Sequence, residues 1–114
     1  MSGKYRNIRT TIDGLTFDSK GEAARYVVLK RAADAGEITK LETQVSYRLE
    51  VNGQKVAVYR ADFRYQVEGV EVVEDFKSRA TMTPVFRLKS KLMKAVHGVD
   101  ILITMTPHHP ITAT

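Results

Sequence analysis

A run of alternating apolar and polar residues, interrupted by Asn52-Gly53, constrains the fold of this chain more than any other feature. Apolar side chains recur at every second position of residues 45–51, which is the period of a strand with one buried face. Asn-Gly is a preferred two-residue connection of antiparallel hairpins because both residues adopt positive φ readily. The pattern therefore predicts a hairpin with a return strand over residues 56–67. A turn at Glu68-Gly69 predicts a third strand over residues 70–77, which completes a meander.

A helix is expected before the hairpin. Ser19 and Glu22 have the spacing of a capping box, and Gly36 suits the left-handed conformation that ends a helix. On this helix Glu22 lies in line with three apolar residues: Tyr26, Leu29 and Ala33. An acid in line with an apolar stripe calls for a functional or structural reason.

A second helix is expected after the meander, because Thr83 suits the cap and Pro84 the first helical position. This helix should end at His97-Gly98. Its predicted buried stripe consists of Val85, Leu88, Leu92 and Val96, which leaves three cations facing outward: Arg87, Lys91 and Lys94. The short apolar segment 99–103 predicts a final buried strand.

These expected elements follow the order helix, three strands, helix, strand, which predicts an α/β domain. A chain of 114 residues has room for one domain of ordinary size. We assign residues 11–105 to a single domain, residues 1–10 to a basic N-terminal arm and residues 106–114 to a flexible tail.

The charge balance favours anionic partners. The chain has 18 Lys and Arg against 13 Asp and Glu, a formal net charge of +5, so nucleic acid is the first candidate. The cations expected to bind DNA come from the arm and from the acid-free stretch between Phe76 and Val99: Lys4, Arg6, Arg9, Arg79, Arg87, Lys89, Lys91 and Lys94. No apolar run approaches the roughly 20 residues of a membrane-spanning helix, and no signal-peptide core is present. A cytoplasmic protein without membrane contact is expected.

Carboxylates provide the candidate chemistry. Asp62 lies in the predicted return strand, and Asp75 shares one face of the next strand with Lys77. Hairpin pairing can bring these groups together, with Glu22 or Glu74 nearby. Converging carboxylates repel each other unless a cation lies between them. Because the chain has no cysteine, this pattern predicts a hard divalent metal such as magnesium, with Lys77 acting on a water or phosphate beside it.

Each candidate residue also has a structural interpretation. Asp75 and Lys77 can form a surface ion pair, and Asp62 can pair with Arg60 or Arg64. The role of Glu22 can be limited to the capping box, which needs no metal ion. A zinc site at His97, His108 and His109 is a weaker alternative, because the last two lie in a Pro-flanked tail without a second ligand pair.

Two segments resemble a known family. Residues 59–63 (Tyr-Arg-Ala-Asp-Phe) and 72–77 (Val-Val-Glu-Asp-Phe-Lys) are similar to the core motif of the PD-(D/E)XK nuclease superfamily, with alanine in place of the motif proline. Residues 17–23 and 36–38 resemble small phage-encoded members close to Holliday-junction resolvases. The resemblance implies a restriction-endonuclease-like α-β-β-β-α-β core with a mixed central sheet flanked by helices.

The resemblance also implies roles for individual residues. Asp62 and Asp75 would ligate Mg²⁺, which Mn²⁺ can replace, and the Phe76 carbonyl and Glu22 would complete the site. Lys77 would be catalytic with Glu22, Asp62 and Asp75. Glu74 is an alternative ligand to Asp75. Two further positions, Gln44 and Lys89, also resemble family positions near the site or the phosphate.

The implied activity is cleavage of branched DNA, in particular four-way junctions, by a homodimer in the cytoplasm of a bacterial host. Two alternatives stay open on the sequence. One is a nucleic-acid-binding module that does not cleave. The other is a nuclease that acts on flaps, forks or plain duplex DNA.

Overall fold

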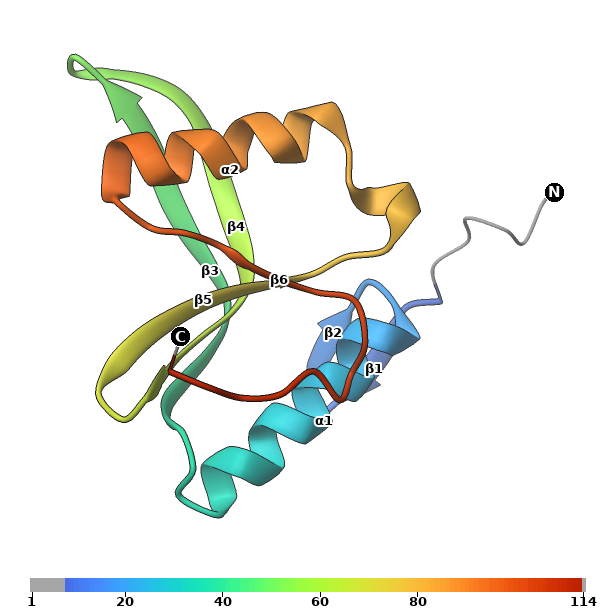
Figure 1. Ribbon diagram of the computed structural model, residues 1–114. Coiled ribbons are helices and arrows are strands. Elements are labelled where there is room, and N and C mark those ends of the chain that lie inside the picture. The colour runs from blue at the N-terminus through green and yellow to red at the C-terminus, as the bar shows by residue number, and fades with distance from the viewer. Residues whose placement is uncertain (1–7, 114) are drawn as a thin grey trace, which may run out of the picture.

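A computed structural model describes residues 8–113 of the chain as one α/β fold (Figure 1). Its sheet has four strands in the order β3-β4-β5-β6, of which β3, β4 and β5 are antiparallel neighbours and β6 is parallel to β5. The elements in chain order are β1 (Thr10–Ile12), β2 (Leu15–Phe17), α1 (Lys20–Asp34), β3 (Thr39–Val51), β4 (Gln54–Val67), β5 (Val70–Phe76), the short 3₁₀ helix η1 (Arg79–Thr81), α2 (Pro84–His97) and β6 (Leu102–Thr104). The expected mixed sheet with two helices is confirmed.

Both helices begin and end where the sequence predicts. The Ser19 hydroxyl accepts a hydrogen bond from the Glu22 amide at 3.1 Å, which caps α1. The Thr83 hydroxyl likewise accepts from the Phe86 amide at 3.1 Å, which caps α2. At its other end α2 stops at Gly98, whose φ of 69° is left-handed.

Two tight turns set the register of the meander. Asn52 and Gly53 have φ values of 51° and 79°, and Glu68 and Gly69 have 51° and 80°. Positive φ at both central residues is typical of the two-residue hairpin turn that matches strand twist. The second turn pairs Val67 with Val70, and the pairing continues to Phe63 opposite Glu74.

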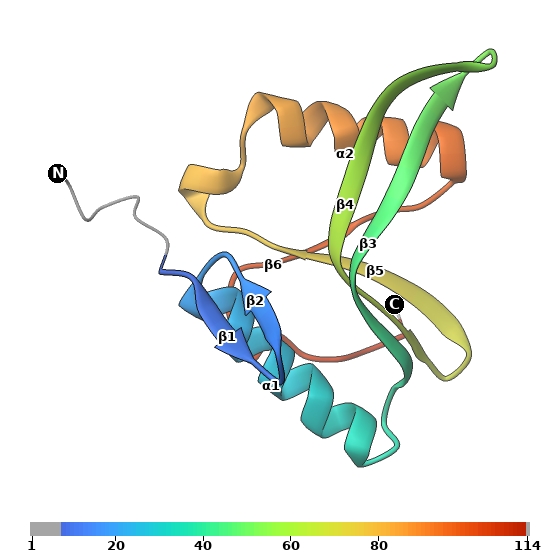
Figure 2. The ribbon, with the colours of Figure 1, turned by 180° about the vertical axis from the view of Figure 1, so that it is seen from behind.

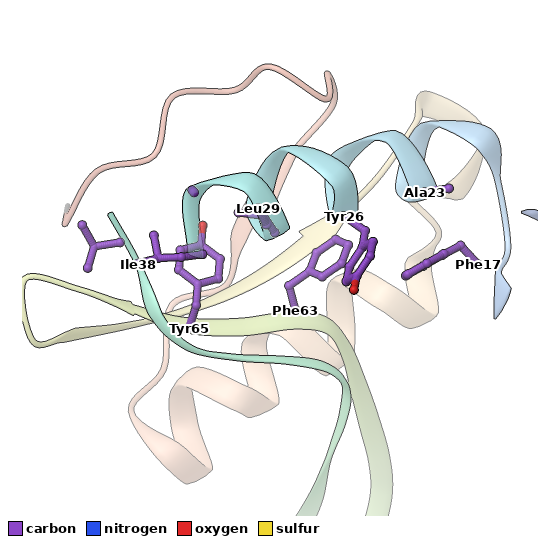
Figure 3. Packing of buried hydrophobic residues seen from close by; sticks show 9 residues of the cluster. Phe17, Ala23, Tyr26, Leu29, Ile38, Phe63 and Tyr65 are labelled. Atoms are coloured by element: carbon purple, nitrogen blue, oxygen red, sulfur yellow. The ribbon is translucent and has the colours of Figure 1, made fainter. Parts of the chain in front are cut away.

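Two apolar clusters hold the helices against the sheet. Phe17, Leu29, Phe63 and Tyr65 belong to the cluster under α1, where the aromatic rings of β4 face the helix (Figure 3). The cluster under α2 contains Leu49, Tyr59, Ala61, Val73, Phe86 and Met93. Every second residue of β4 contributes to a cluster: Tyr59 and Ala61 to the one under α2, and Phe63, Tyr65 and Val67 to the one under α1. The two helices lie toward opposite ends of the bent β3–β4 hairpin (Figure 1).

A buried ion pair ties α1 to the sheet and to the C-terminal segment. Arg25 donates two hydrogen bonds to the Glu74 carboxylate, at 2.7 and 2.9 Å, and both residues have no exposed surface. Its Nη1 also donates to the backbone carbonyls of Pro107 and His109. Ile111 packs against the α1 cluster as well. These contacts make residues 107–113 part of the folded unit, which differs from the expected flexible tail.

Other expectations require correction. Phe86 and Met93 are the buried side chains of α2, whereas Val85 and Leu88 are 62% and 58% exposed. The expected stripe was wrong at Val85 and Leu88, because the two larger side chains lie two turns apart on the face that meets the sheet. Leu92, also expected in the stripe, is partly buried and packs against the cluster under α2. The last strand begins later than expected, at Leu102.

The N-terminal boundary also differs. Thr10, which we assigned to the arm, begins β1, and β1 pairs with β2 beside the first turns of α1 (Figure 2). Of the other arm residues, Ile8 and Arg9 are exposed, and residues 1–7 lie outside the described residues. Within residues 8–113, neither helix combines the length and apolar character that crossing a bilayer requires.

Candidate functional site

Asp62 and Asp75 meet across neighbouring strands. The β4–β5 pairing puts Phe63 opposite Glu74, and continuing it by one residue puts Asp62 opposite Asp75. Directly opposed residues of antiparallel strands have Cβ atoms about 4.5–5.5 Å apart. The Phe76 amide donates to Asp62 Oδ2 at 2.8 Å, which fixes the position of that carboxylate. The expected convergence of these two acids is therefore present.

Asp75 is held from the other side by Tyr59. The Tyr59 hydroxyl donates to Asp75 Oδ2 at 2.7 Å, and the Asp75 side chain is 4% exposed. Lys77 Nζ lies 3.7 Å from the same oxygen and 4.2 Å from the centre of the Phe86 ring. Because the Asp75–Lys77 pair is enclosed, the surface-ion-pair interpretation does not apply to it.

Helix α1 brings the third acid to the cluster. Gly21 allows the first turn of α1 to approach β5 closely, since a Cβ atom added at Gly21 would lie 2.6 Å from Cε2 of Phe76. Glu22, the next residue, is 6% exposed. It lines a cavity of about 270 Å³ together with Asp62, Phe76 and Lys77.

The carboxyl group of Asp62 lies close enough to those of Glu22 and Asp75 to interact with both. Burial, followed by hydrogen bonding with Asp75 and repulsion from Asp75 and Glu22, raises the pKa of Asp62 to about 10. Burial and repulsion from Asp18 also raise the pKa of Glu22. Protonation therefore relieves part of the repulsion, and a bound cation would relieve it in the same way.

Glu74, the neighbour of Asp75, belongs to a separate structural network. Its carboxylate accepts hydrogen bonds from Arg25, from the Tyr65 hydroxyl at 2.6 Å and from the Thr104 hydroxyl at 3.1 Å. All four side chains are buried. Because successive side chains of β5 point to opposite faces, Glu74 belongs to this structural network and Asp75 lies at the candidate site with Lys77.

The donor set fits a hard divalent cation in its chemistry, although no group of three or more His, Asp or Glu side chains within residues 8–113 is arranged to hold a metal ion. Asp62 and Asp75 are each held through Oδ2 by a donor from the protein, an arrangement that orients metal ligands in other sites. Oxygen donors suit Mg²⁺ and Mn²⁺. Ligation by the Phe76 carbonyl stays a prediction.

Residues 2–105 match a protein family with the description "Protein of unknown function (DUF1064)". The chain belongs to the DUF1064 family. Neither a curated protein nor a solved structure matches it. The candidate site lies wholly within the matched residues of this DUF1064 chain.

The predicted DNA-binding cations of the DUF1064 chain differ in their surroundings. Lys89 is partly buried and lines a second cavity beside Asp75. Lys94 forms an exposed ion pair with Asp100 at 2.9 Å. The remaining described members are exposed: Arg9, Arg79, Arg87 and Lys91. Lys4 and Arg6 lie outside the described residues.

Other sequence candidates lie elsewhere or have other partners. The Gln44 amide donates to the Thr16 carbonyl, so it ties β3 to β2. Arg64 pairs with Glu42 at 2.8 Å and therefore does not neutralise Asp62. The His97 ring is hydrogen-bonded to the Arg48 carbonyl. The described residues thus give no support to a zinc site at the three histidines.

Two residues that support the site, Arg25 and Tyr59, were not predicted from the sequence. Arg25 is fully buried, and its spacing of three from Glu22 and four from Leu29 could have placed it on the inner face of α1. Tyr59 supplies the hydrogen bond to Asp75. No sequence signal separates Tyr59 from an ordinary core tyrosine.

Proposed function

We propose that the protein is a Mg²⁺-dependent DNA endonuclease of the PD-(D/E)XK superfamily that hydrolyses phosphodiester bonds in branched DNA. The observation that carries the proposal is the meeting of Glu22, Asp62 and Asp75 with Lys77 at one point between α1 and β5. The order of elements, with a helix before the meander and a parallel strand after α2, supports the restriction-endonuclease-like topology.

Asp62 and Asp75 are the proposed principal ligands, with Glu22 and the Phe76 carbonyl completing the site. When bound, Mg²⁺ or Mn²⁺ would supply Lewis-acid stabilisation of charge at the phosphate. The protein holds the two aspartates through the Phe76 amide and the Tyr59 hydroxyl, so their orientation is set before any ion binds.

Lys77 is the proposed cationic catalytic group. Its backbone amide donates to the Thr104 carbonyl at 2.8 Å, which anchors the residue to β6. Its ammonium lies between the Asp75 carboxylate and the Phe86 ring, with 18% of the side chain exposed. From that position it can donate a hydrogen bond to the attacking water or to a phosphate oxygen.

The proposed substrate class follows from the cations around the site and from the family resemblance. Lysine and arginine contacts to phosphates read the course of the backbone more than the base sequence. Paired cuts on a four-way junction need two active sites at a fixed separation, so we propose that a homodimer acts on this substrate.

The test is incubation of an end-labelled four-way junction with the protein and Mg²⁺ or Mn²⁺, beside flap, fork and duplex DNAs. Asp75→Asn and Lys77→Met should each abolish cleavage while leaving the fold intact by circular dichroism. Glu71→Gln is the matched control, because Glu71 is exposed on the same strand. Wild-type protein that leaves every DNA intact with both metals would contradict the proposal. Preference for plain duplex would remove only the assignment to junctions.

A DNA-binding module without nuclease activity is the second candidate. It is favoured by the observation that no group of three or more His, Asp or Glu side chains within residues 8–113 is arranged to hold a metal ion. Binding of the junction without cleavage, unchanged in Asp75→Asn, is the result that this candidate predicts.

A further inference from the structure

Glu22, Asp62 and Asp75 are called the acidic cluster below. A second cavity, of about 330 Å³, opens on this cluster between β4 and the start of α2. It shares Asp18, Asp62 and Lys77 with the cavity beside α1. The acidic cluster therefore has two openings, one on the side of each helix.

The two openings differ in charge. Lys77 is the only cation among the residues that line the cavity beside α1, which also include Asp18, Glu22 and Asp62. The cavity beside α2 adds two cations to Lys77, namely Arg60 and Lys89. Three acidic residues line each opening, so the two further cations attract a phosphate more strongly on the α2 side.

Arg60 and Lys89 are available to an anion. No ion pair or side-chain hydrogen bond occupies either of them within residues 8–113, whereas Arg25, Arg64 and Lys94 are all paired. They come from different elements, β4 and α2, and face one cavity. Arg60 was expected only as a candidate partner of Asp62, and these two described residues form no ion pair.

We propose that this cavity is the binding groove for the DNA strand next to the cut, in which Arg60 and Lys89 hold the phosphate that neighbours the scissile one. The direction of approach rests on the proposed function: the strand enters from the α2 side, and the opening beside α1 stays available to water and the metal ion. The groove binds backbone, so it contributes affinity without base specificity.

The rest of the lining fits a nucleic acid strand better than a free anion. Val58 and Val85 line the same cavity and are 39% and 62% exposed, so they offer apolar surface to deoxyribose. Thr83, the N-cap of α2, also lines the groove, which places the positive end of the helix dipole near the bound phosphate.

The test measures junction affinity in EDTA as a function of salt, for wild type, Arg60→Gln, Lys89→Gln and the double variant. Loss of one phosphate contact should reduce the slope of log K against log salt by about 0.9. Because both side chains hold the same phosphate, the double variant should lose about 0.9 in slope, and each single variant should lose less. Affinity should fall by a similar factor for junctions of unrelated sequence. Arg31→Gln and Lys40→Gln are the charge-matched controls, because they lie at the end of α1 and the start of β3, away from α2 (Figure 1).

A double variant whose affinity and salt slope equal those of the control variants would overturn the groove assignment. Cleavage in Mg²⁺, measured on the same proteins, reports separately on the proposed function. Cleavage by wild type together with unchanged binding by the double variant would contradict the groove assignment and support the proposed nuclease function. A reduced salt slope in the double variant, with no cleavage by wild type, would support the groove assignment and contradict the proposed nuclease function.

Discussion

Replacing Arg25 with methionine should destabilise the protein severely, because it leaves the Glu74 carboxylate buried without a cation. Both partners have no exposed surface, and two hydrogen bonds of 2.7 and 2.9 Å join them. Removing one partner of a buried pair costs about 3–5 kcal/mol. Two carbonyls, of Pro107 and His109, also lose their donor, which adds about 1 kcal/mol. The total of about 4–6 kcal/mol approaches the whole stability of a marginal domain, about 5–15 kcal/mol.

Urea denaturation followed by circular dichroism measures this loss, and Arg48→Met provides the matched control. Arg48 pairs with Glu50 at 2.7 Å, but the side chains are 60% and 43% exposed, so its loss should cost less than about 1 kcal/mol. Arg25→Met combined with Glu74→Leu should recover part of the stability, because no buried charge remains. A loss of stability in Arg25→Met no larger than that in Arg48→Met would show that the buried pair does not stabilise the fold.

Three further predictions concern the site. In EDTA, Asp62→Asn should be more stable than wild type at pH 9 and nearly equal to it at pH 4. The raised pKa of Asp62 lets the folded wild type retain a proton that the unfolded chain has already released. Wild type therefore loses stability as pH rises toward about 10. Equal urea midpoints for the two proteins at pH 9 would contradict this. Gly21→Ala should cost about 1–3 kcal/mol in a thermal melt despite the better helix propensity of alanine, because its Cβ overlaps the Phe76 ring; a gain in Tm would show that the ring moves freely. Tyr59→Phe should weaken Mn²⁺ binding by about 10-fold or more through loss of the hydrogen bond to Asp75, and unchanged affinity in a calorimetric titration would count against it.

Local signals in the sequence predicted most of the framework. Ser19 and Gly36 mark the ends of α1, and Thr83 and Gly98 those of α2, because caps satisfy backbone groups with side chains or conformations that few residues provide. The pairing of Asp62 with Asp75 could also be predicted from the sequence. A two-residue turn at 68–69 pairs residue 67 with residue 70, and counting back along both strands puts position 62 opposite position 75.

Features that depend on packing between distant segments were not predictable in the same way. Helix α2 carries two apolar lines, and only the sheet decides that Phe86 and Met93 are buried while Val85 and Leu88 are exposed. The C-terminal segment is polar and contains prolines, yet Arg25 holds its carbonyls from a position 82 residues away in the sequence. Such contacts leave no local pattern.

A Mn²⁺ titration followed by electron paramagnetic resonance, which measures the free ion, tests whether Asp62 and Asp75 form a metal site. The account predicts that wild-type protein binds Mn²⁺, that Mg²⁺ displaces it, and that Asp75→Asn weakens binding by more than about tenfold while remaining folded. Glu71→Gln should bind as wild type does. Equal Mn²⁺ affinity in wild type and a folded Asp75→Asn, or no binding by either protein, would contradict the claim that these carboxylates form a metal site.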